Sequence, residues 1–213
     1  MKKPDPKLIQ ALFERFEADK PDPRTELDFI NPFTLLVAVV LSAQTTDKAV
    51  NKATEPLFRI ADNPRDMAAL GEERLTPMLG SLNLYRGKAR NVIKLSQILI
   101  DRYDGEVPRN REALVELPGV GNKTASVVLN ELGIEPAIAV DTHVFRVSHR
   151  LGLVDASAKT PEKVEQQLMQ VIPEKWLTRA HHWLILHGRY VCVARKPKCD
   201  ICIVNHLCPR IGL

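Results

Sequence analysis

The 213-residue chain lacks a long hydrophobic segment, because its longest apolar run is the stretch LLVAVVL at 35–41. Such a run is far too short to span a bilayer. The basic start, Met1-Lys2-Lys3, is not followed by the apolar region of a signal peptide. We therefore expect a soluble, cytoplasmic protein that has no membrane partner.

The sequence also lacks strand-like alternation of apolar and polar residues, and it has no low-complexity segment. Helix signals recur instead. Asp5-Pro6 and Asn31-Pro32 each place a capping residue before a proline, which is typical of a helix start. The continuous apolar run after Asn31 predicts a buried central helix, and NPRDMAAL with GEERLTPML predicts two short helices. The expected fold class is all-α.

Cysteine is scarce and confined to one place, where Cys192, Cys199, Cys202 and Cys208 form a C-x6-C-x2-C-x5-C array. In an intracellular protein such a group is more typical of metal ligands than of disulfides. Structural zinc sites commonly pair their ligands as two C-x2-C units, and this array has one. The uneven spacing favours an iron–sulfur cluster, although spacing alone leaves zinc open.

The charge of the chain is mildly basic, with a formal net charge of +4 and a pI of about 8.9. That balance is compatible with nucleic-acid binding but is weak support for it. The distribution says more, because Arg195, Lys196 and Lys198 lie between the first two cysteines and only Asp200 opposes them. A cluster that orders this loop would present three cations to a phosphate backbone.

The segment LPGVGNKTASVVLNELG at 117–133 places Gly119, Val120 and Gly121 between two helical patterns. Glycines allow a close approach of another backbone, and the first N–H groups of a helix form an anion site. This helix–hairpin–helix pattern predicts binding of a DNA phosphate without regard to base sequence. The alternative is an ordinary helix–helix turn with a glycine cap.

Together, LPGVGNKTA, AVDTHVFRV, HHWLILHGRYVC, the cysteine array and the early NPFTLLVAVVLSAQTTD resemble the endonuclease III family of DNA glycosylase/AP lyases. The resemblance runs from about residue 8 to residue 208. It implies a two-lobed all-α fold: a six-helix barrel lobe at 25–135, which holds the hairpin, and an iron–sulfur lobe made of 1–24 and 136–213. It also implies a [4Fe-4S] cofactor on the four cysteines.

By match to the family motif, Lys123 is the nucleophile and Asp141 its carboxylate partner. An amine is suited to this chemistry, because attack at C1′ displaces the base and leaves an imine, which acidifies the C2′ hydrogen and permits β-elimination. The amine must be neutral to attack. The positive end of a helix dipole disfavours an ammonium there, and we expect partial burial of Lys123 to act in the same direction. The alternative for Lys123 is an ordinary solvated lysine, and the alternative for Asp141 is a helix N-cap.

A base inside a duplex must be flipped out before it is cleaved, and the resemblance implies residues that fill the gap. Gln44 matches the plug residue of the family and Leu84 its apolar wedge. The chain departs from the family at Asn83, where glycine is common; asparagine tolerates a left-handed turn. Asp47 and His143 match positions that line the pocket for the base, although Asp47 could simply cap a helix.

Two other functions share part of this pattern. Monofunctional adenine glycosylases share the hairpin and the cysteines but lack the nucleophilic lysine and carry a glutamate in the early helix, which reads LLVAVVLSAQTTD here. A non-enzymatic DNA-binding module is disfavoured by Lys123 with Asp141. We therefore expect a monomeric base-excision-repair enzyme, located at the nucleoid. It would remove damaged bases from double-stranded DNA and cleave 3′ to the abasic site. The resemblance implies oxidised pyrimidines as the damaged bases, while the sequence leaves a mismatch preference or action on abasic sites alone open.

Overall fold

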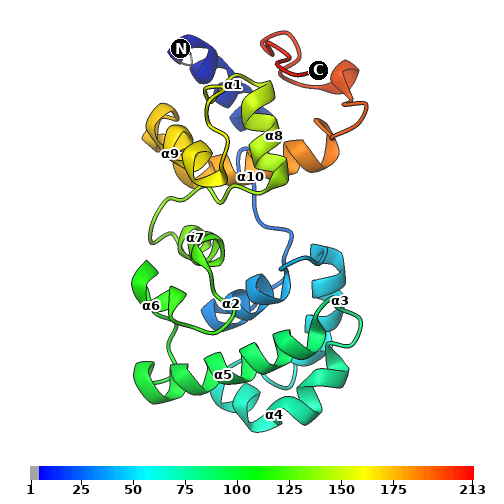
Figure 1. The fold of residues 1–213 in the computed structure, drawn as a ribbon, viewed down its shortest axis with the longest axis vertical. Coiled ribbons are helices and arrows are strands. Elements are labelled where there is room, and N and C mark those ends of the chain that lie inside the picture. The colour runs from blue at the N-terminus through cyan, green and yellow to red at the C-terminus, as the bar shows by residue number, and fades with distance from the viewer. Residues whose placement is uncertain (1–4) are drawn as a thin grey trace. The chain divides into compact units, whose positions relative to one another are not determined.

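The computed structural model describes residues 5–213, and every regular element in this range is a helix. The predicted all-α fold is thus confirmed; the basic start of the chain lies outside the described residues. The elements shown in Figure 1 are α1 (Pro6–Asp19), α2 (Pro32–Leu41), α3 (Asp47–Phe58), α4 (Pro64–Met78), α5 (Tyr85–Tyr103), α6 (Arg111–Val115), α7 (Asn122–Glu131), α8 (Thr142–Arg150), α9 (Pro161–Val171), α10 (Glu174–Tyr190) and the 3₁₀ helix η1 (Cys199–Ile201).

Local chemistry sets several helix boundaries. Asn31 and Thr34 form a capping box at the start of α2, because the side chain of each accepts a hydrogen bond from the backbone N–H of the other, at 2.9 Å. Helix α4 is interrupted at Gly71, whose φ of 67° and ψ of 168° are not helical. The two short helices predicted for this region are therefore present as the two halves of α4.

The chain divides into two compact units. One consists of Thr25–Ile134 and contains α2 to α7. The other combines the described part of Met1–Arg24 with Glu135–Leu213 and contains α1, α8, α9, α10 and η1. Each unit has its own buried hydrophobic cluster, as expected for structural units of this size. In the described residues, no helix combines the length and apolar character needed to cross a membrane.

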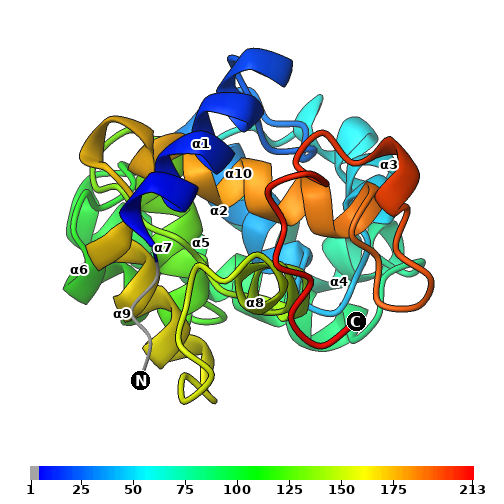
Figure 2. The same cartoon turned by 90° about the horizontal axis from the view of Figure 1, so that it is seen from above.

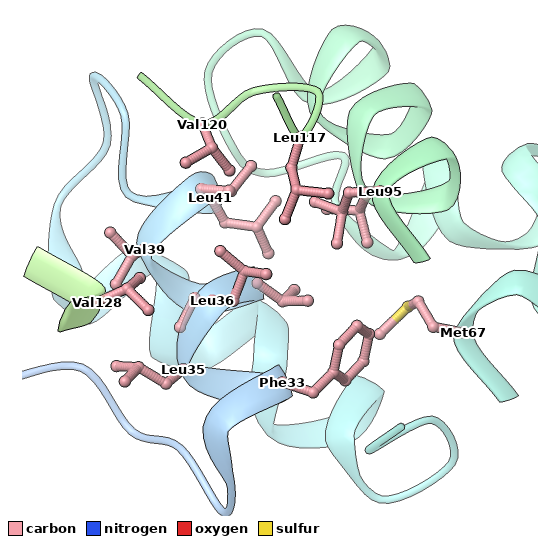
Figure 3. Packing of buried hydrophobic residues seen from close by; sticks show 14 of the residues in the cluster. Phe33, Leu35, Leu36, Val39, Leu41, Met67, Leu95, Leu117, Val120 and Val128 are labelled. Carbon is pink, nitrogen blue, oxygen red and sulfur yellow. The ribbon is translucent and has the colours of Figure 1, made fainter. Parts of the chain in front are cut away.

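Helix α2 is the centre of the unit Thr25–Ile134, because every residue from Phe33 to Leu41 is buried. Figure 3 shows its side chains packed against Met67, Leu95 and Val128. Leu117 and Val120, which flank the first glycine of the hairpin, point into the same cluster. The buried helix thus provides the surface on which the glycine hairpin is fixed.

Helices α1 and α10 cross one another in Figure 2, and aromatic side chains of these two helices pack together in the core of the second unit. Phe13 stacks on Trp176 with ring centroids 5.7 Å apart. The indole N–H of Trp176 donates a 2.9 Å hydrogen bond to Glu17, so the buried ring has its polar atom satisfied. This packing anchors α10, which leads directly into the cysteine array.

Candidate functional site

The first glycine of the hairpin is required by the fold. Gly119 has a φ of +84°, in the left-handed region, and a Cβ atom added there would lie 3.0 Å from the Asn91 amide nitrogen and 3.1 Å from Val40. Val120 next to it is buried, and its N–H donates to the Leu117 carbonyl at 3.0 Å. Both the backbone angle and the space therefore exclude larger residues at position 119.

The second glycine, by contrast, is not required by the fold. Gly121 is the N-cap of α7 with φ −96° and ψ 178°, angles open to any residue, and no atom lies within 4 Å of an added Cβ. It forms no side-chain cap, although serine, aspartate or asparagine would stabilise the helix more. Its bare backbone leaves the first N–H groups of α7 open to an anion.

Lys123 is the second residue of α7, so its ammonium lies at the positive end of that helix dipole. Its side chain is exposed, and the expected partial burial is wrong, because no neighbouring element of the same unit covers the start of α7. Arg111 adds a second cation beside this helix, since its guanidinium donates to the Ser126 hydroxyl at 2.8 Å. The first turn of α7 contains no acidic residue.

Asp141 belongs to the other unit and is the N-cap of α8. One carboxylate oxygen, Oδ1, accepts 2.8 Å hydrogen bonds from the backbone N–H groups of both His143 and Val144. Oδ2 forms no hydrogen bond within residues 5–213. The side chain is half-buried. The capping role is therefore observed, and it engages one of the two carboxylate oxygens.

His143 is held in a defined state by Arg146. A guanidinium nitrogen of Arg146 lies 3.3 Å from His143 Nδ1. Because arginine only donates hydrogen bonds, Nδ1 must accept, which places the ring proton on Nε2. The same guanidinium donates to the carbonyls of Gly188 at 2.8 Å and Cys192 at 3.1 Å. Gly188 permits this close packing, since an added Cβ would lie 2.9 Å from the His143 Cβ.

The predicted plug and wedge, Gln44 and Leu84, are both exposed, and both have left-handed backbone angles, with φ of 55° and 56°. Leu84 is 66% exposed, which is unusual for a large apolar side chain in a turn between helices. The turn that contains Asn83 does include a left-handed residue, but the positive φ falls on Leu84 and not on Asn83. Asp47 begins α3, but Thr46 supplies the cap.

The four cysteines converge on one cavity, which His187, Lys198, Asn205 and Arg210 also line. Burial raises the pKa of the thiols of Cys202 and Cys208 above the usual value, and the other thiols nearby act in the same direction. Four sulfur donors around one cavity fit a metal–sulfur cluster. Hydrogen-bond donors to the sulfur atoms, which stabilise thiolate ligands, are also in place.

Arg150, a buried residue of α8, supplies one of these donors. Its guanidinium lies 3.5 Å from Cys192 Sγ and donates to the carbonyls of Val193 at 2.8 Å and Ala194 at 3.0 Å. The backbone N–H of Arg210 lies 3.4 Å from Cys208 Sγ. Donors from two segments therefore reach the cysteine sulfurs.

Arg195, Lys196 and Lys198 all have exposed side chains. The carbonyls of the preceding residues point inward to Arg150, and the N–H of Lys198 donates to Val191 O at 3.0 Å. The loop is thus fixed from inside while its three cations face solvent. That arrangement is suited to a polyanionic backbone.

Comparison with known proteins agrees with this geometry. Residues 37–174 match the HhH-GPD superfamily of base excision DNA repair proteins, and residues 192–208 match the iron–sulfur binding domain of endonuclease III. Endonuclease III of Rickettsia conorii is 55% identical over 94% of this chain and 95% of that protein, and the Escherichia coli K12 enzyme is 50% identical over 92% of both.

The chain belongs to the endonuclease III family. A solved structure of a trapped endonuclease III–DNA covalent intermediate is 47% identical, with a TM-score of 0.88 over 97% of this chain and 96% of that one. A thermostable thymine-DNA glycosylase, at 23% identity and a TM-score of 0.82 over 96% of each chain, shares the fold.

Family membership confirms the predicted activity, a DNA glycosylase that is also an AP lyase in base excision repair, and the predicted [4Fe-4S] cofactor. DNA is the binding partner. Sequence reasoning missed Arg146, Arg150 and Lys88, whose partners lie 40 or more residues away in the chain. The motif THVFRVSHR contains both arginines at a four-residue spacing, which is the one sequence signal that could have pointed to them.

Proposed function

We propose that Lys123 is the nucleophile of both reactions. Its neutral amine attacks C1′ of deoxyribose, the bond from C1′ to the base breaks, and the base leaves with the electron pair and takes up a proton. The sugar ring opens to a protonated imine on Nζ. Removal of a C2′ proton then forms a C2′–C3′ double bond and breaks the bond from C3′ to the 3′ phosphate. Water hydrolyses the imine and restores the amine.

Asp141 is the proposed carboxylate partner. Its Oδ1 is engaged by the N–H groups of α8, and its Oδ2 has no hydrogen bond within the described residues. An oriented carboxylate with one available oxygen is suited to stabilise positive charge on the sugar and to accept a proton. The N-cap geometry supports this role because it fixes the side-chain rotamer before substrate binds.

The hairpin of Gly119, Val120 and Gly121 is the proposed phosphate site, and the observation that carries the proposal is the bare N-terminus of α7. The fold leaves position 121 free for a larger residue, and yet the chain has a residue with no side chain that could cap the N–H groups. A phosphate bound there would place its sugar near the start of α7, where Lys123 is located. Arg195, Lys196 and Lys198 are proposed to contact further phosphates.

The [4Fe-4S] cluster is proposed to be held by Cys192, Cys199, Cys202 and Cys208. When bound, it supplies a structural cross-link and no step of the base-excision chemistry. The chain's own contribution is Arg150, which ties the carbonyls at 193 and 194 to α8. The cation-bearing loop is thereby ordered on the same element that carries Asp141.

Gln44 and Leu84 are proposed to enter the duplex when the damaged base leaves the stack, and Asp47 and His143 to contact that base. With its proton on Nε2, His143 would donate a hydrogen bond to a carbonyl oxygen of a pyrimidine. We infer that oxidised pyrimidines in double-stranded DNA are the substrates. We also propose that the enzyme acts as a monomer on the DNA of the nucleoid, in the cytoplasm, because one chain supplies every proposed site residue.

Borohydride trapping tests the proposal. The wild-type chain is incubated with an abasic-site duplex and borohydride, which reduces an imine to a stable protein–DNA adduct. Lys123→Gln should abolish the adduct and strand cleavage. Lys94→Gln, an exposed lysine of α5 in the same unit, is the matched control and should retain both. Tight binding by the wild type without any adduct would instead support a non-enzymatic DNA-binding module.

A further inference from the structure

Two turns of the unit Thr25–Ile134 have an unfavourable backbone geometry that needs explanation. Gln44 and Leu84 lie in the left-handed region, which side chains with a Cβ atom rarely adopt. Such residues persist where surrounding contacts hold them, and they cluster at functional positions. Both side chains are exposed, so burial of apolar surface does not hold them in place.

Side-chain hydrogen bonds connect the two turns across 39 residues of sequence. The amide nitrogen of Asn83 donates to the backbone carbonyl of Gln44 at 2.8 Å. In the first turn of α5, Lys88 Nζ donates to the Thr45 hydroxyl at 2.6 Å. Lys88 is 6% exposed, which is unusual for a lysine. The two turns are therefore joined by two hydrogen bonds, whose acceptors are the successive residues Gln44 and Thr45. Leu84 lies between the two donors in the sequence.

We propose that Asn83 is a positioning residue that joins the two turns into one preorganised element, so that Gln44 and Leu84 enter the duplex together. The inference rests on the proposed roles of these two side chains. A preorganised pair loses little conformational freedom on insertion, whereas two independent turns would each have to be ordered on the DNA. We call this pairing of Asn83 with the Gln44 carbonyl the latch.

The experiment compares Asn83→Ala with wild type on two substrates. One is a duplex that contains a single thymine glycol, an oxidised pyrimidine, and requires insertion. The other is a single-stranded oligonucleotide with an abasic site, where no base has to leave a duplex. Loss of one hydrogen bond should lower the ratio of duplex excision to single-strand cleavage by about 2- to 12-fold. The ratio is internal to each preparation, so a partly unfolded protein leaves it unchanged.

A spectroscopic signal follows the insertion itself. With 2-aminopurine opposite the lesion, fluorescence rises when the base is unstacked on binding, and the rise should be smaller for Asn83→Ala at saturating protein. Ser81→Ala is the matched control, because Ser81 is an exposed polar residue of the same turn with no hydrogen bond to the Gln44 turn. It should match wild type in both measurements.

Equal ratios and equal fluorescence for Asn83→Ala and Ser81→Ala would overturn the latch. The same would follow if Asn83→Ala slowed both substrates by the same factor. Neither result affects the proposed nucleophile, which fails separately if Lys123→Gln still forms the borohydride adduct. The two proposals therefore fail on different measurements.

Discussion

Replacement of Gly121 with serine is expected to stabilise the protein slightly while it weakens DNA binding. The backbone angles at this N-cap suit serine, and an added Cβ meets no atom within 4 Å. A serine hydroxyl would accept a hydrogen bond from the first turn of α7, which is worth about 0.2–0.5 kcal/mol over glycine. For a chain of this length that corresponds to an increase in Tm of about 1 °C.

The same hydroxyl would occupy an N–H group of the proposed phosphate site. Loss of one charge-assisted hydrogen bond to a phosphate costs about 1.5–3 kcal/mol. The Kd for DNA should then rise about 10- to 150-fold. Opposite signs for stability and binding distinguish a ligand site from an ordinary helix–helix turn, because a glycine that only shapes a turn would affect stability alone.

Gly119→Ala is the comparison variant. The φ of +84° at position 119 and the 3.0 Å distance from an added Cβ to Asn91 make any side chain unfavourable there. The free energy of unfolding should therefore fall by about 1–3 kcal/mol. Urea melts measure the free energy of unfolding. Fluorescence anisotropy on an abasic-analogue duplex, at several salt concentrations, measures the Kd for DNA. The salt slope of Gly121→Ser should fall by about one phosphate contact. Wild-type affinity and slope for Gly121→Ser would refute the phosphate assignment.

Two further predictions concern buried cations. Desolvation lowers the pKa of Lys88 in the folded chain below its ordinary value of 10.5. Between the lowered pKa and 10.5, the unfolded chain binds more protons than the folded chain. The stability of the wild type relative to Lys88→Met should therefore rise as the pH increases toward 10.5. Paired urea melts test this, and a constant difference would contradict it. Arg150→Met removes the hydrogen bonds to the carbonyls of Val193 and Ala194, so the free energy of unfolding should fall by about 2–4 kcal/mol. The visible absorbance of the cluster should also be lost faster with chelator. Arg15→Met is an exposed control on α1, and identical results for the two variants would contradict the role of Arg150.

Features fixed by neighbouring residues could be predicted from the sequence. The helix starts at Asp5-Pro6 and Asn31-Pro32 lie where the cap-plus-proline pattern places them, because each depends on one side chain and the next few N–H groups. The break in α4 was expected for the same reason, since Gly71 adopts a left-handed angle that other residues avoid. The buried character of α2 followed from its continuous apolar run.

Features that depend on distant packing could not be predicted. The exposure of Lys123 depends on what covers the start of α7, which its own helix does not reveal. Asn83 and Gln44 are 39 residues apart, and each sequence segment alone looks like an ordinary turn. Only the folded chain places the amide nitrogen of one against the carbonyl of the other. The position of a left-handed residue, Leu84 in place of Asn83, is set in the same way.

Helix α8 shows how local and distant effects combine at one candidate site. Its N-cap, Asp141, is fixed by the N–H groups of His143 and Val144, which the motif DTHV makes predictable. Its later turns carry Arg146 and Arg150, whose donors reach carbonyls of the segment 188–194. A short helix capped at one end and hydrogen-bonded along its length has little freedom to tilt. The carboxylate of Asp141, the proposed partner of the nucleophile, is therefore held by contacts that extend to the first cysteine of the cluster site.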